Sequence, residues 1–473
     1  MDKKFYLFSK LLTVFFVCAG FTAMAQETSI QFYRPNNQHG VNMFETGKAD
    51  SVPFKGLKIK VGGNFDLTYQ ALNQQNTALP LTPPGFTSSI NTLLPLVHGF
   101  QLPQANLVFD IQLADGIRMN LTSYLASRHH ENTWVKGGYI QFDKLPFFHS
   151  AVIDNIMKSV TIDIGQNDID YGDQHFRRTD GGNTIYNPFI ENYIMDEFAT
   201  ELGAEFYYHN PSGFFLMGGI TDGQLDQTVA AGTTSLLQGT TISTEYNAID
   251  AKTNKPNKYD PAFLGKIGFD KQVNADFRIR ISGSFYTDNS AQDNTLFFGD
   301  RTGSHYFNVL QSAAISSAAS TSNVIADQND YYPWTGRLNP AFSEEVHTYM
   351  GNLFLKYKGL EFFGTIEDAH GRSITETTNR QMKQYAADVI YRFPEDKQNF
   401  WVGFRYNTVN GMIQGNTTSI TINRTAGSVG WFLTKNIMTK AEYVDQEYLG
   451  YSPYNILNGG KFHGVCIEAS IAF

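Results

Sequence analysis

Residues 465–473 read Val-Cys-Ile-Glu-Ala-Ser-Ile-Ala-Phe, and this stretch decides the fold class. Apolar side chains at every second position share one face: Val465, Ile467, Ala469, Ile471 and Phe473. The other face holds small or polar residues: Cys466, Glu468, Ser470 and Ala472. Because side chains alternate along a strand, this pattern predicts a β-strand with one face in lipid and the other in a wet interior.

The beginning of the chain has the pattern of an export signal. Asp2-Lys3-Lys4 precedes an apolar run from Leu11 to Phe21, and Ala23-Met24-Ala25 forms a small-x-small cleavage site. We therefore expect residues 1–25 to be a signal peptide and the mature chain to begin at Gln26.

The two cysteines bear on the same question. A lipoprotein signal using Cys18 is the alternative reading, and the bulky Val17 directly before it disfavours lipidation. Removal of the signal leaves Cys466 as the single thiol, so we expect an exported protein without an intrachain disulfide.

Composition excludes several classes. The chain has 473 residues, a net charge of −9 and 14% aromatic residues, and its mean hydropathy is −0.29. No basic patch is interleaved with aromatics, so nucleic acid is not an expected partner. A polar interior inside a lipid-facing wall accounts for low hydropathy combined with many aromatics. A soluble β-sandwich or propeller would explain strands, but not the alternation of short and long connections together with the export signal and the terminal Phe473.

Alternating segments recur along residues 55–473. We predict an all-β transmembrane antiparallel barrel of about sixteen strands, within 14–18. Tight connections lie at residues 114–116, 209–213, 358–359, 394–398 and 434–436, and long ones at 73–102, 168–199, 222–261, 288–344 and 447–460. Such alternation places long loops outside the cell and short turns in the periplasm. Outer-membrane lipid and lipopolysaccharide are then the surrounding partners, and the terminal Phe473 is the expected signal to the barrel-assembly machinery.

The third outer loop, residues 168–199, combines paired arginines, aspartates and many aromatics. Here the chain resembles the sixteen-stranded porins of the Gram-negative outer membrane, both general and phosphate-selective (O/P-type). The resemblance implies that this loop folds inward and narrows the pore, with Asp173, Arg177, Arg178 and Asp180 at the constriction. Opposed charges there would filter solutes by charge. The alternative is a packed surface loop with solvated arginines. A homotrimer is one expected assembly.

Charges on the inward faces nearly balance. The lumen-wall residues that we single out are Arg118, Arg278, Arg280, Arg392, Arg405, Glu201, Glu205, Glu361 and Asp388. A phosphate-selective relative would show a dominant ladder of arginine or lysine. This chain lacks one, which argues against strong anion specificity.

No catalytic constellation stands out, so we do not expect an enzyme. His129-His130-Glu131 is a weak metal candidate because adjacent side chains diverge, and His463 alone does not make a hydrolase. We assign no metal site. Loop-stabilising Ca²⁺ near residues 222–226 or 288–294 is the single cofactor considered, although the spacing of a calcium loop is absent.

Residues 26–54 precede the first strand and are too apolar for an idle tail. We expect a periplasmic or lumenal segment, with a disordered leader as the alternative. The predicted function is passive diffusion of small hydrophilic solutes or ions, where sixteen strands enclose a channel. The alternatives are a hydrophobic-substrate transporter plugged by residues 26–54, and a surface adhesin or scaffold barrel.

Overall fold

The computed structural model describes residues 29–50, 52–125, 134–179, 184–224, 236–237, 240–241, 249–256, 260–291, 293–297, 305–313 and 336–473. The predicted signal peptide, Asp180 and the His129–Glu131 cluster lie outside these residues. No helix in the described part of the chain is long and apolar enough to cross a membrane.

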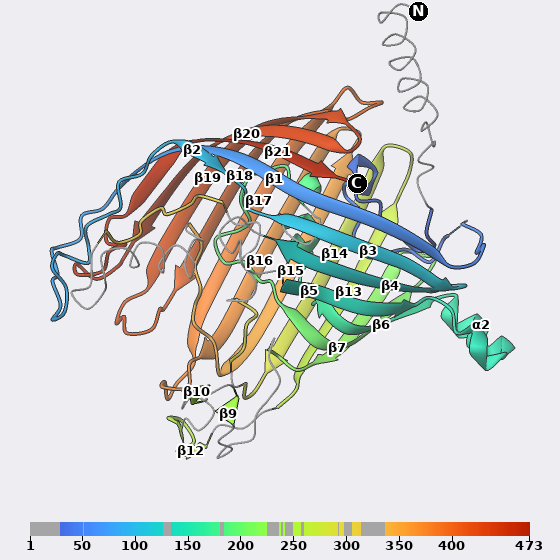
Figure 1. The fold of residues 1–473 in the computed structure, drawn as a ribbon, viewed down its shortest axis with the longest axis horizontal. Coiled ribbons are helices and arrows are strands. Elements are labelled where there is room, and N and C mark those ends of the chain that lie inside the picture. The colour runs from blue at the N-terminus through green and yellow to red at the C-terminus, as the bar shows by residue number, and fades with distance from the viewer. Residues whose placement is uncertain are drawn as a thin grey trace, which may run out of the picture.

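The described residues form a closed antiparallel barrel of sixteen long strands (Figure 1). These strands are β1 (Lys58–Gln75), β3 (Ala105–Ala114), β4 (Ile117–Leu125), β5 (Trp134–Phe142), β6 (Val160–Asp168), β7 (Thr200–His209), β8 (Phe214–Thr221), β13 (Ala262–Gln272), β14 (Phe277–Asp288), β15 (Glu345–Tyr357), β16 (Leu360–Arg372), β17 (Arg380–Phe393), β18 (Phe400–Gly411), β19 (Ile420–Thr434), β20 (Ile437–Leu449) and β21 (Lys461–Ala472). The barrel closes where β1 pairs with β21, from Asn64 opposite Ala472 to Gln75 opposite Lys461. The predicted fold and strand number are confirmed.

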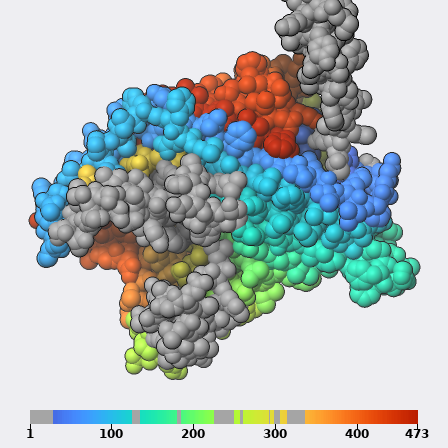
Figure 2. Space-filling model, in the orientation of Figure 1, coloured from blue at the N-terminus to red at the C-terminus, as the bar shows by residue number. Residues whose placement is uncertain are grey.

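Short elements decorate the connections. The strand β2 (Gly99–Gln101) pairs with β1, and the hairpins β9–β10 (Leu236–Leu237, Thr240–Thr241) and β11–β12 (Ile249–Asp250, Lys255–Pro256) lie between β8 and β13. Single 3₁₀ turns are η1 (Gln38–Gly40), η3 (Pro146–Phe148), η4 (Gln174–Arg177) and η5 (Thr184–Tyr186). A short helix, α2 (Ala151–Met157), lies between β5 and β6. Figure 2 shows α2 projecting at one end of the barrel and the first long loop lying at the other end.

The outer surface of the wall is apolar. Leu67, Ile164, Ile267 and Ile366 are between 46% and 60% exposed, although each belongs to a regular strand. At the short-turn end, Tyr391, Phe393, Phe400 and Trp431 stack across three neighbouring strands, with ring centroids 5.2–6.0 Å apart. A tall apolar band bordered by aromatic rings is the surface of an integral outer-membrane β-barrel.

The interior is packed, which differs from the water-filled lumen that we expect from strand count. Towards the loop end, four inward-facing apolar side chains of the wall are fully buried: Val346, Ile422, Val444 and Phe462, each 0% exposed. They form one hydrophobic cluster with loop residues such as Ile194. The filling comes from two long loops that fold inward, and burial of their apolar side chains stabilises them there.

Candidate functional site

The third loop, residues 169–199, lies across the lumen. Its backbone N–H groups donate to inward-facing side chains of three strands. Ile190 N donates to Glu442 at 2.8 Å, Ile194 N to Asn407 at 2.7 Å, and Met195 N to Gln384 at 3.0 Å. The wall therefore supplies the hydrogen bonds that an irregular buried backbone requires.

The fifth loop, residues 289–344, enters the lumen from the side of β1 and β20–β21. Phe307 N donates to Gln70 at 2.8 Å, and Gln70 Nε2 donates back to Phe307 O at 3.0 Å. The two loops meet where Leu338 N donates to Ile194 O at 2.7 Å. Together they leave little free space in this half of the barrel.

Asp173 is buried among cations of the wall. Both carboxylate oxygens accept from Arg280 at 2.8 Å, and Ser282 donates at 2.7 Å. Lys266 Nζ is 3.3 Å away. Burial alone would raise the pKa of the Asp173 carboxyl, but Arg280 and Lys266 outweigh burial and hold this pKa well below its usual range.

Arg177 and Arg178 also lie inside the barrel, 5% and 3% exposed. Arg177 donates to Asn42 at 2.6 Å, lies 3.6 Å from Glu361 and stacks over the Phe363 ring. Arg178 donates to Asp196 at 3.1 Å. Both charges are paired with fixed partners inside the lumen, so the arginines are not solvated on a surface loop. The fourth expected constriction residue, Asp180, lies outside the described residues.

The remaining lumen-wall residues point inward and are paired in the same way. Arg278 binds Asp270 at 2.6 Å, Arg392 binds Glu361 at 3.0 Å, and Arg405 binds Asp388 at 2.7 Å. Glu201 accepts from Tyr286 at 3.0 Å, and Glu205 accepts from Asp170 N at 3.0 Å. Arg118 lies 3.8 Å from Asp110 and donates to Gln141.

The N-terminal segment, residues 29–57, crosses the short-turn mouth of the barrel. Gln31 N donates to Gln112 at 2.8 Å on one side, and Gln38 N donates to Lys435 O at 2.7 Å on the other. Farther along the segment, Lys48 Nζ forms an ion pair with Asp143 Oδ1 at 2.8 Å. The segment also inserts Glu45, whose oxygens accept from Arg280 at 2.6 and 2.7 Å.

One substantial cavity, of about 260 Å³, interrupts the packing among the described residues. It lies between the β3–β7 wall and a floor made by the N-terminal segment and the third loop. Its lining follows β6 from Thr161 to Asp168. The inward-facing Asn120, Tyr139 and Asp163 are half-buried here, whereas inward-facing residues on the opposite wall are buried. We call this space the polar cavity.

The lining of the polar cavity carries more acid than base. Among described residues it includes three arginines or lysines (Arg34, Arg118 and Lys136) and six carboxylates (Glu45, Asp110, Asp163, Asp168, Asp170 and Glu205). Two of the six are paired with cations behind the lining, Glu45 with Arg280 and Asp170 with Lys266, which leaves four carboxylates against three cations. The Oδ1 atom of Asp163 has no hydrogen-bond partner within the described ranges of the chain. Electrostatics of this kind favour positively charged solutes.

Backbone geometry makes room for the cavity. Gly137 of β5 faces inward opposite Thr122, and a side chain there would meet only the Gln166 carbonyl, at 3.4 Å. The lumen-wall residues expected from the sequence did not include Gly137 or Tyr139. A glycine at an inward-facing strand position leaves space in the lumen, and this was the signal that the sequence offered.

Comparisons with known proteins add the following. No family model matches the chain, and no curated protein matches it. Among solved structures, it is similar to OmpT, an outer membrane protein of Vibrio cholerae, with 9% identity, coverage of 89% of this chain and 99% of that one, and a TM-score of 0.46. An anion-selective porin from Comamonas acidovorans shows 9% identity, coverage of 88% and 100%, and a TM-score of 0.46. The outer membrane channel DcaP of Acinetobacter baumannii shows 9% identity, coverage of 88% and 98%, and a TM-score of 0.45. These values are too low to argue function, which must come from the lumen itself.

Proposed function

We propose that this protein is a narrow outer-membrane channel that passes small polar solutes along the polar cavity and prefers cations. The observation that carries the proposal is the course of the cavity lining along β6, from Thr161 to Asp168. This strand has 9 residues, the length that a tilted strand needs to cross a bilayer. A lining that follows a spanning strand from end to end supports a route through the wall side of the lumen.

The size and chemistry of the cavity support the substrate class. Its volume of about 260 Å³ lies below that of pockets for drug-sized ligands, about 300–1,000 Å³, so the solutes must be small. The charged lining supports polar solutes and does not favour the hydrophobic-substrate alternative. The excess of carboxylates, with the unpartnered Asp163 oxygen among them, supports cations over phosphate.

A reversal-potential measurement in a salt gradient tests the proposal. Purified protein in planar bilayers should prefer cations, and Asp163→Asn should reduce that preference. Asp396→Asn, an exposed carboxylate on the β17–β18 turn, is the matched control and should have little effect. The Asp163 effect should shrink at high salt, because the Debye length falls from about 10 Å at 0.1 M to about 3 Å at 1 M. Anion preference, or an ineffective Asp163→Asn, would contradict the proposal.

A second candidate function has one observation in its favour. The ion pairs and hydrophobic cluster that fill the opposite side of the lumen also suit a surface adhesin or scaffold, in which the barrel only carries the long loops. That alternative predicts no conductance from correctly folded protein in the same bilayers.

A further inference from the structure

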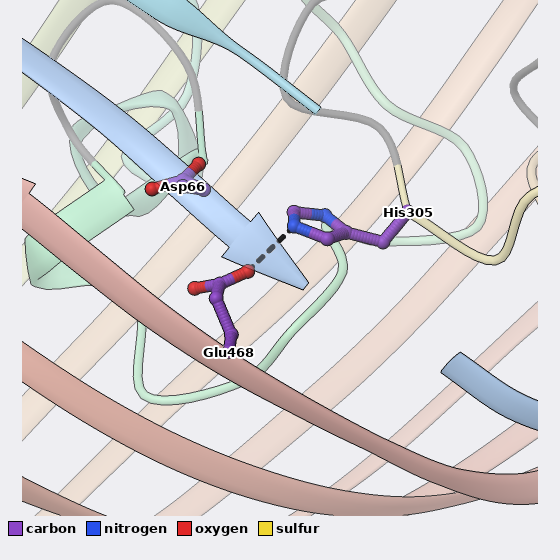
Figure 3. A group of neighbouring side chains, drawn as sticks. All are labelled: Asp66, His305 and Glu468. Atoms are coloured by element: carbon purple, nitrogen blue, oxygen red, sulfur yellow. Dashed lines mark ion pairs between the residues drawn. The ribbon is translucent and has the colours of Figure 1, made fainter. Parts of the chain in front are cut away.

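Three side chains that are far apart in sequence converge on one buried point (Figure 3). Asp66 comes from β1, Glu468 from β21 and His305 from the fifth loop. One carboxylate or imidazole atom from each lies within 4.8 Å of the others, and all three residues are 0% exposed. Figure 3 shows the His305 ring pointing from its loop toward both carboxylates, at the seam where β1 and β21 close the barrel.

Each carboxylate is held by one oxygen and presents the other. Asp66 Oδ2 accepts from Gln104 Nε2 at 2.8 Å, while Asp66 Oδ1 has no hydrogen-bond partner in the part of the chain that the structure describes. Glu468 Oε1 accepts from Lys440 at 2.8 Å and from Ser470 at 2.9 Å, while Oε2 faces His305 and accepts a long hydrogen bond, 3.5 Å, from Thr68. Outer groups that orient a ligand in this way are typical of metal centres.

The imidazole is also incompletely satisfied. Its Nε2 lies 2.5 Å from Glu468 Oε2, without the alignment of a hydrogen bond, and its Nδ1 has no partner among the described residues. The backbone N–H of His305 donates to Glu191 at 2.6 Å, which fixes the loop. Buried polar atoms are normally paired, so the unpaired Asp66 Oδ1 and His305 Nδ1 require a partner.

The charges around the Asp66–His305–Glu468 cluster also favour a bound cation. Among the described residues, the carboxylates of Asp66, Glu468 and Glu191 lie near His305, and the Lys440 ammonium lies 2.8 Å from Glu468. Uncompensated negative charge is costly in a buried site. A divalent cation would compensate it without adding any further side chain.

We propose that Asp66, His305 and Glu468 bind one divalent transition-metal ion of the Zn²⁺ class. Two carboxylates with one imidazole suit such an ion, at about 2.0–2.2 Å from each donor, with a water completing the coordination. Small side-chain rotations would separate His305 and Glu468 enough for both to coordinate. The ion would fasten the fifth loop to the closing seam of the barrel, so its role is structural. Sequence spacing could not reveal the site, because its ligands are more than 160 residues apart.

The test uses the full mature chain in detergent, stripped with a chelator and titrated with Co²⁺, a Zn²⁺ surrogate with visible absorption. We expect one Co²⁺ per chain, displaced by Zn²⁺ and counted by elemental analysis. His305→Gln should lose this binding. His463→Gln, which alters an exposed histidine on the strand that carries Glu468, should retain it. Gln104→Ala should keep one ion per chain but weaken the affinity about 10–100-fold, as loss of an orienting partner does.

Folding is checked separately by gel mobility before and after heating, which reports an intact barrel. His305 lies in a loop, so its variant should remain folded. Folded wild-type protein that binds no Co²⁺ would overturn the proposal and leave a plain His305–Glu468 ion pair. Equal binding by His305→Gln would also overturn it, because the metal would then sit on other histidines.

Discussion

Arg280 illustrates how the lumen holds its loops. The guanidinium is 1% exposed and donates to Asp173 of the third loop and to Glu45 of the N-terminal segment. Removing one partner of a buried ion pair leaves the others uncompensated. We therefore expect Arg280→Met to lower the free energy of unfolding by about 3–5 kcal/mol, measured by denaturant titration in lipid vesicles. Lys358→Met, which removes an exposed ion pair with Glu395, should leave the unfolding midpoint unchanged. Equal effects would mean that the Arg280 network contributes little.

Gly137 provides the corresponding prediction for transport. Its inward position borders the polar cavity, so Gly137→Leu should fill part of the cavity and reduce single-channel conductance. Gly427→Leu is the matched control, because Gly427 faces outward and a side chain there would meet nothing within 4 Å. The two variants share the same added volume. A conductance that falls equally in both would show that the cavity is not the route.

At the scale of the strand, facing decides which substitutions the membrane tolerates. Leu67, in the middle of β1, is 48% exposed on the outer surface. Leu67→Arg should hinder membrane insertion at a cost of about 2–4 kcal/mol near the bilayer midplane. Asn120→Arg, on the inward face beside the polar cavity, should insert normally. Folding into vesicles, followed by heat-modifiable gel mobility, measures both. Buried positions such as Thr68 and Ser282 are unsuitable inward controls, because the packed lumen leaves them no room for arginine.

The strands could be predicted from sequence, and the filling of the barrel could not. Alternation along residues 465–473 reflects a local property of the strand, its period of two, and so it identified both faces correctly. The course of the third loop depends on contacts such as Ile190 with Glu442, 252 residues away, which no local pattern encodes. A sign of the filling was nonetheless present. Val346 and Met350 of β15 are apolar on the inward face, where a water-filled lumen requires polar residues.

For the candidate site, the sequence identified inward charges but not their partners. Arg177 was expected at a constriction, and in the lumen it contacts Asn42 and Glu361, which come from distant parts of the chain. The metal ligands that we propose were equally beyond reach, because they meet only when the barrel closes.

The whole molecule is a barrel whose lumen is filled on one side, and we propose that small solutes pass through the lumen on the other side. Two inward loops and the N-terminal segment pack against β14–β21, and the polar cavity lies along β3–β7. Access of a thiol reagent to single cysteines on the two sides tests this asymmetry. The native Cys466 is fully buried and should not interfere.

The most direct measurement is therefore single-channel conductance before and after a charged methanethiosulfonate reagent is added to Asn120→Cys and Ser428→Cys. Asn120 is a half-buried inward residue of the cavity wall, and Ser428 is an inward residue of β19 that is 4% exposed. The account predicts that the reagent reduces the current through Asn120→Cys and leaves Ser428→Cys unchanged. Block at Ser428→Cys with none at Asn120→Cys would contradict it, and so would folded protein that carries no current at all.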